Sequence, residues 1–189
     1  MTLIVLGLAL WWAAHLWKRL APGSRARFGE PGKGLVTVLV LAGLVLMVLG
    51  WRGSDWLGIE AAEFVPVWDP PRFLIHVNNL LMLFAFYLYA ASGMKTRITR
   101  VIRHPQLTAV KTWAVAHLLV NGDLAAIVLF GGILAWAVVS VILINKAEPR
   151  APLPAPAPLG KEIGALVGAV VVMGLVMMIH NWLGVPPWG

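Results

Sequence analysis

The sequence has no cysteine and few charged residues. Only 12% of its 189 residues are charged, against about 25% in an ordinary soluble domain. Without thiols, the chain forms no disulfide, thiolate metal site or covalently attached c-type haem. The whole chain is 60% hydrophobic, with a mean hydropathy of +0.83. This balance excludes a soluble globular enzyme and predicts an integral membrane protein in contact with the lipid bilayer.

The common catalytic and nucleotide-binding motifs are also missing. The glycines form no phosphate loop, and there is no GxGxxG, no GxSxG and no Ser/His/Asp order. The net charge is +7, with a pI near 10.4. In a membrane protein, basic residues mark the cytoplasmic loops. We therefore expect no nucleic-acid partner and no hydrolytic nucleophile.

Six apolar runs predict an all-α bundle of six transmembrane helices in a single domain, residues 1–189. Each run is close to the roughly 20 residues that a membrane span needs, so the length leaves no room for a separate aqueous domain. No basic region precedes the first run, so we expect it to be retained rather than cleaved. The predicted helices are Thr2–Trp17, Leu35–Trp51, Phe73–Ser92, Gln106–Val120, Leu124–Asn145 and Ile163–Leu183.

The basic residues predict the orientation of this bundle. If six helices cross the membrane, 13 of the 15 Lys and Arg residues fall on one side. By the positive-inside rule, that side is cytoplasmic and both termini face outward. The thirteen are Lys18, Arg19, Arg25, Arg27, Lys33, Lys95, Arg97, Arg100, Arg103, Lys111, Lys146, Arg150 and Lys161.

Three loop segments have distinct compositions. Loop two, residues 52–72, is acidic and aromatic, and we interpret it as a cap on the membrane surface. Loop five, residues 147–160, alternates Ala with Pro and predicts an extended spacer rather than a site. In loop three, Arg97, Arg100 and Arg103 recur at every third residue. The simplest interpretation is a solvated cytoplasmic face, and phosphate binding is the alternative.

Histidines are the candidate functional residues. His15, His76, His117 and His180 each lie within a predicted span, where an ionisable side chain is costly and suggests function. Imidazole is the commonest metal ligand and a usual axial ligand of haem iron. Zinc favours carboxylate or thiolate partners, which these spans lack. Copper with nearby methionines and a purely structural role stay open, but a b-type haem needs only one or two imidazoles.

Depth in the membrane separates these histidines. At about 1.5 Å per residue, His117 lies roughly 20 Å above the cytoplasmic face, in the outer half with His76 and His180. His15 lies about 21 Å down from the outer face. On this estimate His117 and His76 form the best pair of ligands, with His180 in reserve. Lys111 either extends to the cytoplasmic surface or meets a haem propionate.

Several segments resemble the NnrU family. The most specific is Arg103-His104-Pro105, followed by Trp113, Ala116-His117-Leu118-Leu119 and Asn121-Gly122-Asp123. Ala14-His15-Leu16, Leu74-Ile75-His76 and the closing His180 add to it, so the resemblance covers nearly the whole chain. Ala109 and Lys111 depart from the family pattern beside the predicted pocket.

The resemblance implies a multi-pass protein of the bacterial inner membrane, so the outer side, where the basic residues predict both termini, is the periplasm. It suggests a haem b protein acting in nitric oxide or nitrite (denitrification) metabolism or redox sensing. Because the family is related to 15-cis-zeta-carotene isomerases, it also implies haem ligands at His117 and His15 and, as an alternative, cis-trans isomerisation of a polyene. A third hypothesis is a cofactor-free assembly subunit for a nitric oxide reductase or another membrane redox protein.

Overall fold

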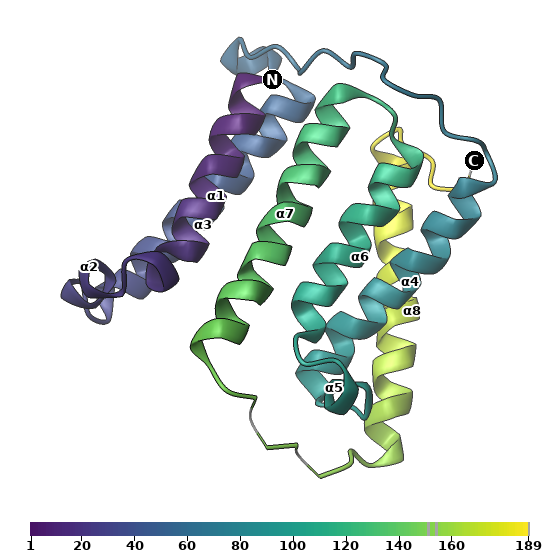
Figure 1. Cartoon of the computed structure of the whole chain (residues 1–189). Coiled ribbons are helices and arrows are strands. Elements are labelled where there is room, and N and C mark those ends of the chain that lie inside the picture. Colours follow the sequence, from purple (N-terminus) through teal and green to yellow (C-terminus); the bar gives the residue numbers. More distant parts are fainter. Residues whose placement is uncertain (151, 154, 189) are drawn as a thin grey trace. The chain divides into compact units, whose positions relative to one another are not determined.

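A computed structural model describes residues 1–150, 152–153 and 155–188. The described chain is helical and forms no β-strand in these ranges (Figure 1). Six helices have at least sixteen residues, and three short helical segments lie in the loops between them. In chain order the elements are α1 (Thr2–Leu20), α2 (Pro22–Arg27), α3 (Pro31–Arg52), η1 (Asp55–Leu57), α4 (Leu74–Met94), α5 (Ile98–Val101), α6 (Pro105–Val120), α7 (Leu124–Ala147) and α8 (Leu159–Trp182).

Five of these helices, α1, α3, α4, α7 and α8, are long and apolar enough to cross a membrane. Large apolar side chains are exposed along α3 and α8, Leu41 and Val170 among them, as expected for helices that face lipid. The all-α membrane class is therefore confirmed. Because α6 has only 16 residues, about 24 Å of rise, the predicted count of six spans is not settled by length.

The predicted helix positions are correct, but several ends are displaced. α3 begins at Pro31 and not at Leu35, and α8 begins at Leu159 and not at Ile163. The prediction from hydropathy began α3 and α8 too late because Lys33 and Lys161 interrupt the apolar pattern. A proline fits the first helical turn, where its missing N–H is not needed. The same preference explains α2, which begins at Pro22 inside a segment that was predicted to be a loop.

The chain divides into two compact units, Met1–Trp68 with Asp123–Trp136, and Asp69–Gly122 with Ala137–Gly189. In the first unit, α1 and α3 lie side by side (Figure 1). Glycines allow their backbones to touch: a Cβ added to Gly7 would lie 2.6 Å from the carbonyl oxygen of Gly43. Small residues at a crossing are typical of membrane helix pairs.

Loop two is fixed to the first unit at several points. Ala62 is buried, and its N–H donates to the carbonyl oxygen of Gly50 at 2.7 Å. Phe64 packs on Trp51, with ring centroids 5.0 Å apart. Val65 accepts a hydrogen bond from the N–H of Leu124 at 2.8 Å. The loop is therefore an ordered segment over the ends of α3 and α7.

In the second unit, α4 packs on both α6 and α8 (Figure 1). Its core contains Ala85 and Leu88 of α4 and Ala109 of α6, with Trp113 packed against them. The small side chains of Ala85 and Ala109 let the two helices approach closely. This packing orients α6, the helix that contains His117.

Candidate functional site

The five histidines are divided between the two units. His15 lies in α1 of the first unit, whereas His76, His117 and His180 lie in α4, α6 and α8 of the second. His104 is outside the helices, at the N-cap of α6. Four of the imidazoles thus lie on four different long helices.

His117 has the hydrogen bonding of a preoriented imidazole. Its Nδ1 lies 2.9 Å from the carbonyl oxygen of Trp113, one turn earlier in α6. A carbonyl oxygen only accepts, so Nδ1 carries the proton and the lone pair of the neutral ring is on Nε2. The Trp113 ring lies against the imidazole, with centroids 5.0 Å apart. Metal-bound histidines commonly hold their second nitrogen in this way.

His15 repeats this arrangement in α1. Its Nδ1 lies 2.9 Å from the carbonyl oxygen of Trp11, and the two ring centroids are 4.3 Å apart. Trp136 of α7 closes the cluster, with its ring centroid 4.7 Å from that of His15. The Nε1–H groups of Trp11 and Trp136 are buried without a hydrogen-bond partner. The imidazoles of His15 and His117 thus each contact a tryptophan that lies four residues earlier in the same helix.

The sequence contains a signal for this arrangement that the histidine positions alone do not reveal. Trp-x-x-x-His occurs at Trp11–His15 and at Trp113–His117. Residues four apart on a helix are neighbours on one face, so the spacing itself predicts the contact of the rings. The contact of Trp136 with His15 had no such signal, because it depends on how α7 packs against α1.

His180 and His76 differ in their surroundings. His180 Nδ1 lies 2.9 Å from the carbonyl oxygen of Val176, again one turn earlier. His76 is exposed in the first turn of α4, and its side chain has no hydrogen bond within the described residues. His180, the reserve candidate, therefore shares the held Nδ1 of His117, whereas His76 does not.

Two polar residues, Lys111 within α6 and Asn121 at its end, lie near His117 in the sequence. Asn121 Nδ2 donates to the backbone oxygen of His117 at 2.8 Å, so it caps the end of the helix. Lys111 is half-buried two turns into α6. No hydrogen bond links its side chain to the part of the chain that the structure describes. The pairing of Lys111 with a haem propionate stays a prediction.

The described residues contain no group of three or more His, Asp or Glu side chains that could hold a metal ion. A site built from several protein ligands on a bare ion is thus not formed by the described side chains. A haem supplies the equatorial ligands of its own iron, so it needs only one or two imidazoles from the protein. The imidazoles of the described helices are of the kind that such a cofactor would use.

The fold and the histidine-bearing helices define a multi-pass helical membrane protein. The model of the NnrU family, described as NnrU protein, matches residues 3–187. Because this match covers nearly the whole chain, the protein belongs to the NnrU family. No curated protein and no solved structure matches it.

Proposed function

We propose that this NnrU-family protein binds a b-type haem, with His117 as an axial ligand, and serves nitric oxide or nitrite metabolism or redox sensing. The observation that carries the proposal is the orientation of the His117 ring, whose Nδ1 is held by the Trp113 carbonyl at 2.9 Å. That bond places the lone pair on Nε2, the nitrogen that binds iron. The metabolic role rests on the family resemblance.

The hydrogen bonding of the imidazoles is consistent with a cofactor role. The Nδ1 contacts of His15, His117 and His180 are each to a residue four positions earlier in the same helix, so each helix orients its own ring. An ionisable ring in an apolar helix is costly and suggests function.

A bound haem would supply an iron centre that changes oxidation state or binds a small ligand such as nitric oxide. The chain would contribute the rest. The Trp113 ring lies against that of His117, and Asn121 caps the last turn of the same helix. His15, His76 and His180 are the candidates for a second iron ligand, and Lys111 is the candidate partner of a propionate.

Absorption spectroscopy tests this proposal on the full chain purified from haem-replete cells. We expect a Soret band, and we expect H117A to lose it or to shift it strongly. Individual H15A, H76A and H180A variants assign the second ligand, because its removal converts a six-coordinate spectrum into a five-coordinate one.

H104A is the matched histidine control. Its ring lies outside the spans and contacts Asn145 Oδ1 at 2.8 Å, so it should leave the spectrum unchanged. A folded, colourless wild-type protein with no iron would exclude the haem site and favour the cofactor-free assembly role. A coloured protein whose spectrum is insensitive to H117A would refute the assignment of His117.

The topology belongs to the same proposal. α6 completes six spans, both termini lie on the outer side, and the chain resides in the bacterial inner membrane. The uneven distribution of basic residues between the two sides supports an even number of spans. In the second unit α6 packs against α4, which is one of the five long apolar helices.

A further inference from the structure

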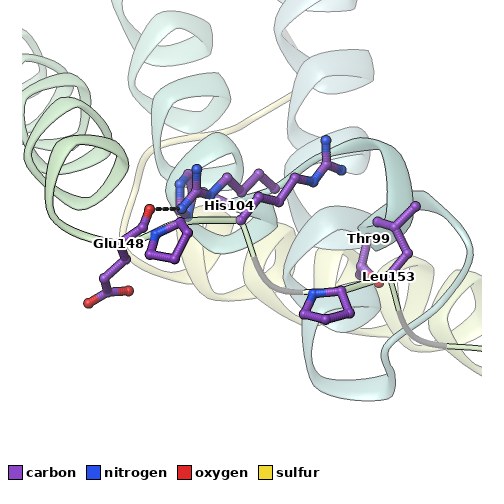
Figure 2. A pocket seen from close by; sticks show the side chains of 8 residues that line it. Thr99, His104, Glu148 and Leu153 are labelled. Atoms are coloured by element: carbon purple, nitrogen blue, oxygen red, sulfur yellow. Dashed lines mark hydrogen bonds between the residues drawn. The ribbon is translucent and has the colours of Figure 1, made fainter.

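A hollow of about 250 Å³ lies where the segments after α4 and after α7 meet, within the second unit (Figure 2). Thr99, Arg103 and His104 line it from the first segment, and Glu148, Arg150 and Leu153 line it from the second. The sequence predicted a solvated arginine face for the first segment and a spacer without a site for the second. The spacer prediction is incomplete, because its first residues form one wall of this hollow.

Two arginines cross-link the walls of the hollow. Arg103 Nη2 donates to the carbonyl oxygen of Glu148 at 2.6 Å. In the opposite direction, Arg150 Nη2 donates to the carbonyl oxygen of Arg100, also at 2.6 Å. Each guanidinium is thus anchored through one nitrogen to the backbone of the other segment. Since a guanidinium has five N–H donors, each anchored group keeps further donors for a ligand.

The two guanidinium groups of the hollow are held by uncharged groups. The hydrogen bonds of Arg103 and Arg150 to the described segments go to backbone carbonyl oxygens, so these bonds leave the positive charges in place. Figure 2 shows the Glu148 carboxylate pointing away from the other side chains drawn. His104, at the N-cap of α6, also lines the hollow, so the positive end of that helix dipole adds to the potential.

We propose that this hollow binds a phosphate group, with Arg103 and Arg150 as its ligands. Fixed guanidinium groups match phosphate oxygens in geometry and charge. The size admits a phosphate with part of the group that it esterifies, and is below the 300–1,000 Å³ typical of drug-sized pockets. This site is separate from the histidines and does not depend on haem binding.

The phosphate can belong to an anionic lipid or to a soluble anion. The lipid source is consistent with exposed apolar side chains beside the arginines, since Leu153 is 53% and Val101 75% exposed. Basic residues next to a membrane span attract anionic headgroups. A soluble phosphate would use the same guanidinium donors without the apolar surface.

Binding to the purified, delipidated full chain in an uncharged detergent tests the site and separates the two sources. Native mass spectrometry would measure retention of phosphatidylglycerol and of diacylglycerol, which lacks the phosphate. Isothermal titration with inorganic phosphate forms the soluble arm. We expect R103Q/R150Q to weaken phosphate-dependent binding roughly tenfold or more, because charge-assisted hydrogen bonds are lost.

Two further variants control for charge and folding. R97Q removes an arginine of the same segment whose side chain does not line the hollow, so binding should be retained. R103K/R150K keeps both charges but loses the planar fork, and should restore binding only in part. Circular dichroism verifies that each variant keeps its helix content.

Each outcome has a defined meaning. Selective retention of phosphatidylglycerol by the wild type, lost in R103Q/R150Q, supports a lipid site, and binding of inorganic phosphate alone supports a soluble ligand. The proposal is overturned if R103Q/R150Q binds as well as the wild type, if R97Q weakens binding equally, or if diacylglycerol is retained as well as phosphatidylglycerol.

Discussion

At the scale of single residues, glycine decides how closely α1 and α3 approach. A Cβ at Gly7 would lie 2.6 Å from the Gly43 oxygen and 2.8 Å from the Met47 nitrogen, and a Cβ at Gly50 would lie 2.8 Å from the Ile4 nitrogen. All of these neighbours are backbone atoms, which cannot rotate away as a side chain can. The helix pair therefore cannot accept even a methyl group without separating.

We predict that G7A destabilises the first unit by about 1–3 kcal/mol, the cost of overpacking a close contact. G168A in α8 is the matched control, because a Cβ there would meet nothing within 4 Å and both substitutions gain the helix propensity of alanine. Thermal unfolding in detergent, followed by circular dichroism, measures the difference. Equal midpoints for the two variants would show that the backbones are not in contact.

The tryptophans that precede His15 and His117 act at the same scale. Each gives its backbone oxygen to the imidazole and places its own ring against it. A substitution of the tryptophan keeps the carbonyl but removes the ring contact.

If haem is bound, W113L is therefore expected to shift the Soret maximum or broaden it without abolishing it, whereas H117A abolishes or strongly shifts it. Loss of the Trp113 ring loosens the position of the His117 imidazole but keeps its Nε2, the proposed ligand atom. W182L is the control, since Trp182 at the end of α8 is 83% exposed. Loss of all haem in W113L, in a folded protein, would instead give Trp113 a direct role in holding the cofactor.

At the scale of elements, the start of α7 is fixed by Asp123. Its Oδ1 accepts a hydrogen bond from the N–H of Ala126 at 2.8 Å, which caps the first turn. The backbone of Asp123 also pairs with Pro66 of loop two. One residue thus begins the helix and connects it to the cap over the first unit.

D123A should cost about 0.5–2 kcal/mol of stability, the usual effect of losing an N-cap. D123N keeps an accepting oxygen and should recover most of the loss. D69A serves as the control, because Asp69 is exposed in the same loop region. Denaturant titration in detergent gives the three values, and a D123A midpoint equal to that of D69A would contradict the capping role.

At the scale of the whole molecule, the basic residues predict an orientation in the membrane that cysteine labelling can measure. The chain has no cysteine, so single cysteines report sidedness without background labelling. Trp56 in loop two is 91% exposed, and Ser24 is exposed in α2, the short helix of loop one.

With both termini outside, W56C should react with a membrane-impermeant maleimide in intact cells, and S24C only after permeabilisation. The reason is that loop one contains the cluster of basic residues and loop two the acidic ones. The unaltered chain is the blank for this measurement. The reverse labelling pattern would invert the topology and place the arginine hollow on the outer side.

The sequence alone determined the class, the number and order of long helices and the histidines that they contain. These features were predictable because transfer of each apolar run into lipid depends on its own composition. Even the contact of the Trp113 and His117 rings follows from a local spacing of four. The ends of α3 and α8 were misplaced where Lys33 and Lys161 interrupt hydropathy inside a continuing helix.

Only the tertiary structure decided which distant residues meet. Trp136 is 121 residues from His15, yet its ring lies against it. Arg103 and Arg150 reach the backbone of each other's segment across more than forty residues. Such contacts arise from the packing of helices and the path of loops, which no local pattern encodes. For that reason the first residues of a predicted spacer, Glu148 and Arg150 among them, form one wall of a charged hollow.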